Sequence, residues 1–157
     1  MLSFSWELKN LKSKHLRDII FRRVKESDLN DVYVLLNQLK EVDQDSIDKE
    51  RAWKNFSKNT SANSIVGIVD GKIVAYGSAV IENKIRGEVA GHIEDIVVDK
   101  NIEKKMIGTY LVKELIEICK KEKCYRITLF CNDNLVNFYS RNGFKVNNVM
   151  MKKFLDY

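Results

Sequence analysis

The segment from Gly91 to Phe130 constrains the fold of this chain more than any other. It begins with "GHIEDIVV", a run rich in β-branched residues that is typical of a strand, and ends with "YRITLF", which has the same character. Between them, apolar residues recur at helical spacing, at Ile107, Leu111, Leu115, Ile116 and Ile118. An amphipathic helix that crosses over between two strands predicts an α/β fold with a mixed central β-sheet flanked by helices.

The first half of the chain predicts a strand and two helices. "IIFRRV" predicts a strand over 18–24, and "ESDLNDVYVLLNQL" predicts an amphipathic helix with Ser27 as its N-cap. Ile47, Ala52, Trp53 and Phe56 predict a second helix over 46–59. A short segment precedes all of these, and we expect residues 1–17 to form an N-terminal arm or a short helix.

The second half adds a hairpin and a short helix. The Asp70-Gly71 pair predicts a tight hairpin between two strands. "NDNLVNFYSRNG" predicts a short helix ended by Gly143, and "FKVNNVMMKKFL" predicts a closing strand. The expected order is β-α-α-β-β-β-α-β-α-β. With no proline and no compositional linker among 157 residues, we expect a single domain over 18–157.

Composition limits the partners that this chain can have. The net charge is +5, but the lysines are dispersed rather than clustered with aromatic residues, so a nucleic-acid partner is not favoured. No apolar run approaches the roughly 20 residues of a membrane helix, so we expect no membrane partner and a cytoplasmic protein. The cysteines, at 119, 124 and 131, and two histidines fit no zinc-site spacing. We therefore expect reduced thiols and no metal.

The helix start after "DIVV" is a candidate phosphate site. Unpaired N–H groups and the positive end of the helix dipole attract anions at such a position, here from Lys104 to Thr109. Phosphate loops usually contain glycines, whereas Lys104, Lys105 and Met106 stand here. Because side chains at Lys104 and Met106 disfavour left-handed backbone angles, we expect right-handed angles and weaker anion binding than in a glycine-rich loop.

These motifs carry a family resemblance that covers Phe21 to Leu155. "IVVDKNIEKKMIGTYLVKEL" resembles the acetyl-coenzyme A motif of the GCN5-related N-acetyltransferase (GNAT) superfamily, and "NFYSRNGF" resembles its F-Y-x-x-x-G-F signature. "GHIEDIVV", "KCYRITLFC" and "MMKKFL" are similar to the branch that acetylates glucosamine 6-phosphate for UDP-N-acetylglucosamine synthesis. The resemblance implies acetyl-coenzyme A as co-substrate, no metal, direct attack by the sugar amine, and a homodimer.

The resemblance also implies the residues of the donor site. The pantetheine arm is expected along Ile96, Val97 and Val98. The pyrophosphate is expected at the helix start, and Tyr139 is expected near the coenzyme sulfur as the proton donor to the leaving thiolate. The complete implied set for acetyl-coenzyme A is Ile96, Val97, Val98, Glu103, Lys104, Lys105, Met106, Ile107, Gly108, Thr109, Asn137, Tyr139 and Arg141.

On the acceptor side, the resemblance implies that Glu94 and Asp95 hold the sugar amine and hydroxyls. Adjacent strand residues point to opposite faces, so we expect one of the two to act through its carbonyl. Lys84 and Arg86 are candidate phosphate ligands, and Lys153 is expected to serve the neighbouring subunit across a dimer interface. The chain departs from the branch at Phe130, where an acid is usual, and at Lys40, where threonine is usual.

Two alternatives to this function stay open. One is a different small-amine, peptide or protein N-acetyltransferase, whose activity would not depend on a phosphate in the acceptor. The other is a coenzyme A-binding protein without catalytic activity, which the missing loop glycines and Phe130 would fit. Binding without turnover would distinguish the second alternative.

Overall fold

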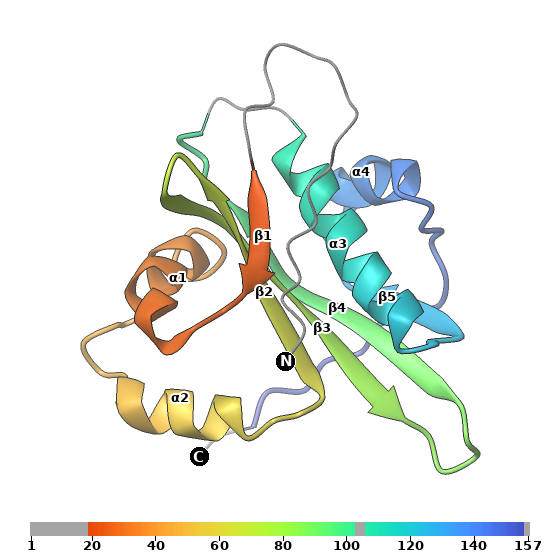
Figure 1. Cartoon of the computed structure of the whole chain (residues 1–157). Coiled ribbons are helices and arrows are strands. Elements are labelled where there is room, and N and C mark those ends of the chain that lie inside the picture. The colour runs from red at the N-terminus through yellow and green to blue at the C-terminus, as the bar shows by residue number, and fades with distance from the viewer. Residues whose placement is uncertain (1–18, 103–105, 156–157) are drawn as a thin grey trace.

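Five strands form one mixed β-sheet in the chain order β1 to β5 (Figure 1). The computed structural model describes residues 19–102 and 106–155. The first four strands pair antiparallel and the fifth runs parallel to the fourth. Their bounds are β1 Ile20–Arg23, β2 Ala62–Val69, β3 Lys72–Asn83, β4 Val89–Val98 and β5 Arg126–Leu129. The predicted mixed sheet is confirmed, and β5 is the strand that makes it mixed.

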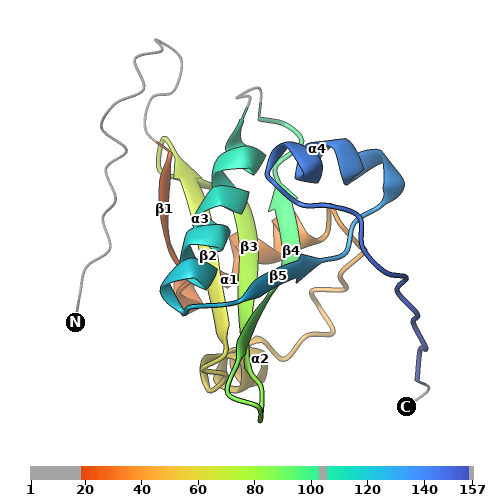
Figure 2. The ribbon, with the colours of Figure 1, turned by 90° about the vertical axis from the view of Figure 1, so that its right-hand side faces the viewer.

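Helices cover both faces of this sheet (Figures 1 and 2). One face carries α1 (Leu29–Leu36) and α2 (Lys49–Ser57), and the other carries α3 (Ile107–Lys121) and α4 (Val136–Arg141). Two short 3₁₀ turns, η1 (Glu26–Asp28) and η2 (Asp133–Leu135), lead into α1 and α4. The α3 crossover between β4 and β5 is the one that the sequence predicts.

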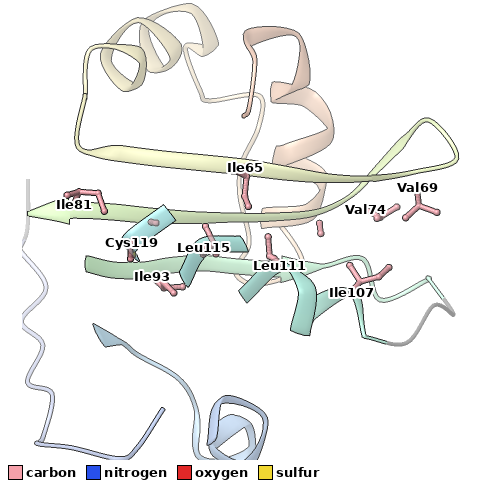
Figure 3. Close-up of a cluster of buried hydrophobic side chains, with 11 residues drawn as sticks. Ile65, Val69, Val74, Ile81, Ile93, Ile107, Leu111, Leu115 and Cys119 are labelled. Atoms are coloured by element: carbon pink, nitrogen blue, oxygen red, sulfur yellow. The ribbon is translucent and has the colours of Figure 1, made fainter. Parts of the chain in front are cut away.

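The core on the α3 face is filled by one ridge of that helix (Figure 3). Ile107, Leu111, Leu115 and Cys119 recur every fourth residue, so they lie on one side of α3, and all are buried. They pack against sheet residues that include Ile65, Val74, Ala75, Ala79, Ile81 and Ile93. On the opposite face, a smaller cluster joins α1 to the sheet through Val32, Leu35, Val66, Tyr76 and Val97. Strand β4 is therefore packed from both sides.

Two turn predictions are confirmed. Asp70 and Gly71 join β2 to β3 with φ angles of 49° and 77°, the left-handed pair that a two-residue hairpin requires. Gly143 follows α4 with φ of 90°, as expected of a glycine that ends a helix. The short range of α4 agrees with the predicted helix.

The starts of the first two helices differ from the prediction. Ser27 lies inside η1, and Asp28 is the N-cap residue of α1. Asp28 is buried and accepts two hydrogen bonds from the Arg22 guanidinium, at 2.6 and 3.0 Å, so a tertiary ion pair determines where the helix begins. α2 begins at Lys49 because the Asp48 side chain accepts the Arg51 N–H at 3.0 Å.

The predicted closing strand is wrong for this chain taken alone. No strand follows α4 in the structure up to residue 155. The segment 145–155 is exposed, and Val149, Met151 and Phe154 are 90%, 93% and 79% accessible. The apolar residues of this segment cover no surface of the described chain, and the expected strand does not form there.

The remaining expectations concern the N-terminal arm, membrane helices, metal sites and the cysteines. The predicted arm at 1–17 lies outside the described residues. Within the described residues, no helix has the length and apolar character needed to cross a membrane. The same residues contain no cluster of three metal-binding side chains, and the three cysteines are free thiols.

Candidate active site

The candidate site lies where β4 and β5 part. Their parallel ladder ends at the pair Ile93 and Leu129. Just before this point, His92 and Thr128 are joined by a hydrogen bond of 2.6 Å between a ring nitrogen and the hydroxyl. Beyond it a cavity of about 220 Å³ opens, and Figure 2 shows α4 beside this point. Its lining is Leu39, Ile93, Glu94, Asp95, Ile96, Leu129, Phe130, Cys131, Asn132, Leu135 and Tyr139.

A β-bulge in β4 brings the two acids to this cavity. Ser78 pairs with Glu94 and Tyr76 pairs with Val97, so two steps along β3 correspond to three along β4. The extra residue is Asp95, whose φ of 54° is left-handed. The bulge interrupts the alternation of side chains, and Glu94 and Asp95 line the same opening. That one of the two acts through its carbonyl stays a prediction.

Gly77 of β3 leaves the space that the bulge needs. A Cβ at this position would lie 2.9 Å from the terminal methyl groups of both Ile96 and Leu115. Those two side chains occupy the volume opposite the bulge on the α3 face. A side chain at this position would therefore displace the ends of these two side chains, which pack closely over Gly77.

Buried hydroxyl groups lie beneath the acids on the α1 face. The Tyr76 hydroxyl donates to Ser64 Oγ at 3.2 Å, and Ser64 Oγ donates to Ser78 Oγ at 2.8 Å. Burial raises the pKa of Tyr76, and the nearby charge of Asp95 raises it further. Asp95 is therefore close enough to this buried hydroxyl group to act on it through its charge.

Tyr139 forms the α4 wall of the cavity. It is buried, and its ring meets those of Phe138 and Phe144 edge to face at centroid distances of 4.9 and 6.0 Å. Burial, and next the neighbouring Cys131, raise the pKa of the Tyr139 phenol. The hydroxyl therefore keeps its proton at neutral pH and can donate it.

Only part of the helix start that we expect to bind a phosphate lies within the residues that the structure describes. Glu103, Lys104 and Lys105 lie outside the described residues. Met106 is the N-cap of α3 with φ of 76°, so the expected right-handed angle is wrong at this residue. The first N–H groups of α3, at Ile107, Gly108 and Thr109, have no acceptor within the helix. Packing against the core determines this start, since Ile107 itself is 2% exposed.

The predicted basic residues are not brought to the cavity. Lys84 and Arg86 lie at the β3–β4 turn, where they form ion pairs with Glu82 and Glu88. Glu94 lies five residues beyond the first pair of that hairpin, which corresponds to about 17 Å along β4. Lys153 belongs to the exposed segment after α4. Among the described residues that line the cavity, none is Lys or Arg.

Other predicted residues lie around the cavity, and some lining residues were missed. Val97 is buried, whereas Asn137 and Arg141 are exposed on α4. Leu39, Asn132 and Leu135 were not predicted as site residues. Leu39 and Asn132 lie outside the regular elements and Leu135 ends the short η2 turn, so no periodicity reveals which way their side chains point. A larger cavity of about 390 Å³, between α2 and β2, contains none of the predicted residues and no acid.

Known proteins share this arrangement. The acetyltransferase (GNAT) family pattern matches residues 29–144. A glucosamine 6-phosphate N-acetyltransferase of Candida albicans is 33% identical over 139 residues, covering 83% of this chain and 92% of that protein. The chain belongs to the GNAT family. The Arabidopsis thaliana enzyme of the same name is 39% identical to this GNAT chain over 88 residues, covering 55% of the chain and 59% of that protein.

The fold of this GNAT chain also matches that of a solved relative. The crystal structure of glucosamine-6-phosphate N-acetyltransferase from Arabidopsis thaliana superposes with a TM-score of 0.79 at 30% identity. The match covers 89% of this chain and 100% of that one. The parted strands, the bulge and the α3 start are thus features of a GNAT fold.

Proposed function

We propose that this GNAT protein transfers the acetyl group of acetyl-coenzyme A to the amine of D-glucosamine 6-phosphate, giving N-acetylglucosamine 6-phosphate for UDP-N-acetylglucosamine synthesis. One observation carries the proposal: at the point where β4 and β5 part, a bulge brings two adjacent acidic residues, Glu94 and Asp95, to the lining of one cavity. Relatives named for this reaction, at 31–39% identity, support the choice of acceptor.

The donor side of the cavity fits an acyl-coenzyme A. Beyond Ile93, β4 has no partner on its β5 edge, so the backbone of 96–98 is free to pair with the amides of a pantetheine arm. The N–H groups of Ile107, Gly108 and Thr109 point to where a pyrophosphate would bind. Asn137 and Arg141 are exposed on α4, and we assign them to the same ligand.

The acceptor amine needs to be held and deprotonated. Glu94 and Asp95 attract the ammonium form, orient it, and accept its proton directly or through water. The neutral amine nitrogen then attacks the thioester carbonyl carbon and gives up a second proton to the carboxylates or to water, so a C–N bond forms and the C–S bond breaks. The leaving thiolate takes the Tyr139 proton, which solvent restores. No covalent intermediate with the protein is needed.

We also propose a homodimer, because none of the described residues that line the cavity is a Lys or Arg that could hold the acceptor phosphate. Lys84 and Arg86 are ion-paired and distant from Glu94. The exposed apolar segment 145–155 is suited to pack on a second copy, and it carries Lys153. Lys153 would then hold the phosphate in the neighbouring subunit's site. Mixing inactive Lys153→Ala and Glu94→Gln variants should restore part of the activity if this is so, because mixed dimers contain one intact site.

Free thiols in the described chain favour a reducing compartment, and we assign the protein to the cytoplasm.

The function is tested by release of coenzyme A thiol, with the product mass confirmed. We expect rapid release with glucosamine 6-phosphate, slow release with glucosamine, and none with peptide amines. The double variant Glu94→Gln, Asp95→Asn should bind coenzyme A normally and turn over at least 100-fold more slowly, since it retains shape but accepts no proton. Equal rates with the two sugars would exclude phosphate recognition, and activity on peptides alone would replace the proposal.

A further inference from the structure

Three large apolar side chains converge on the mouth of the candidate active site. Leu39, Phe130 and Leu135 are 52%, 65% and 41% exposed, and all three line the cavity of about 220 Å³. They come from three separate places in the chain: the turn after α1, the end of β5, and η2. Exposed apolar groups from distant segments that meet at one cavity mark a surface that a ligand covers.

The strand register places Phe130 beside Glu94. The β4–β5 ladder ends at Ile93 and Leu129, so Glu94 and Phe130 are the first residues beyond it on the two strands. Thr128 is bonded to His92 on one face of the sheet. Glu94 is the second residue after His92, and Phe130 is the second residue after Thr128, just past the end of β5. The acid on β4 and the aromatic residue after β5 therefore lie on the two sides of the point where these strands part, and both line the cavity.

The chemistry of the cavity is divided between these two sides. One side offers the carboxylates of Glu94 and Asp95, which suit an ammonium group. The other offers the apolar wall of Leu39, Phe130 and Leu135, which can form no hydrogen bond through their side chains. A hexosamine matches both, because it carries its amine at the edge of a ring whose face presents carbon-bound hydrogens. A flat aromatic ring packs well against such a face.

We propose that Phe130, flanked by Leu39 and Leu135, is the specificity-determining residue of the acceptor site and packs on the sugar ring while Glu94 and Asp95 hold the amine. The inference rests on the proposed function and adds to it the residue that recognises the ring.

The test distinguishes recognition of the sugar ring from recognition of the amine. Phe130→Ala should raise the KM for glucosamine 6-phosphate about tenfold and leave the KM for acetyl-coenzyme A within twofold. Glucose 6-phosphate, which has the ring but no amine, should inhibit competitively, and Phe130→Ala should raise its inhibition constant by the same factor. Glu94→Gln should raise the KM for glucosamine 6-phosphate but leave that inhibition constant unchanged.

Two further variants serve as controls. Phe130→Tyr keeps the ring and should stay within twofold of the wild type. Ile85→Ala removes an exposed apolar side chain at the β3–β4 turn, away from the cavity, and should leave these constants unchanged.

Three results would overturn the inference while leaving the proposed function intact. They are an unchanged acceptor KM in Phe130→Ala, a rise in the KM for acetyl-coenzyme A instead, and a change in association state by sedimentation. The last two would show that the ring contacts the donor or a second copy of the chain. A wild-type protein that does not acetylate glucosamine 6-phosphate would refute the proposed function, and the inference would fail with it.

Discussion

The two edges of β4 behave differently at the same residues. On the β3 side, pairing resumes after the bulge and continues to Val98. On the β5 side, pairing stops at Ile93 and leaves the rest of the strand open. The site therefore lies where the β4–β5 ladder ends. The β3–β4 ladder and the core on both faces of the sheet hold the open part of β4 in place. The comparison separates residues that hold β4 in place from residues that act in the opening.

The largest effect on stability is expected on the β3 side of β4, where strand pairing continues past the bulge. Gly77→Val should lower the free energy of unfolding by about 3 kcal/mol, since even the Cβ of the new side chain would lie 2.9 Å from the Ile96 and Leu115 methyl groups. Chemical denaturation measures this. Gly108→Ala is the matched control, because its Cβ would be in ordinary contact with Phe138 at 3.4 Å. Equal stability of the two variants would show that the bulge does not need glycine on β3.

Substitutions at the opening between β4 and β5 should change the reaction rate rather than the stability of the fold. Tyr139→Phe should reduce kcat about 30-fold, which is about 2 kcal/mol, because the leaving thiolate loses its proton donor. The ring contacts with Phe138 and Phe144 remain, so the unfolding midpoint should stay within a degree of the wild type. Steady-state kinetics together with thermal denaturation distinguish the two effects. A kcat unchanged by this substitution would remove Tyr139 from the chemistry.

The elements that hold β4 in place were more predictable from sequence than the opening between β4 and β5. The α3 ridge and the Asp70-Gly71 hairpin follow from period and turn chemistry, which are local. The shared orientation of Glu94 and Asp95 depends on a bulge, and the bulge depends on space at Gly77, a residue on another strand. Ser27 failed as the N-cap because Arg22 fixes Asp28 instead. Only tertiary contacts determine such details.

A smaller, pH-dependent effect is expected at β1 and α1, far from the opening. The Arg22 guanidinium, by hydrogen bonding, holds the pKa of Asp28 below its usual value. A carboxyl with a depressed folded-state pKa stabilises the protein above its unfolded pKa, near 4, and loses that contribution as the pH falls through the folded value. Asp28→Asn should therefore cost about 1–2 kcal/mol at pH 7 and less as the pH falls below about 4. Asp31→Asn, which changes an exposed acid of the same helix, should show neither effect in denaturation measured across pH.

The smallest effect concerns the start of α3, where the opening meets the donor. Met106 has a left-handed φ of 76°, which costs a non-glycine residue about 1 kcal/mol. Met106→Gly relieves that strain but adds freedom to the unfolded chain, so stability should rise by only about 0.5 kcal/mol. The bound coenzyme gains closer access to the first N–H groups, and its dissociation constant by calorimetry should fall about threefold. Met106→Ala shortens the side chain but keeps the strain, so it separates access from backbone angle. If Ala and Gly improve affinity equally, the side chain is the obstacle; if neither does, the lysine-rich start binds the donor without needing glycine.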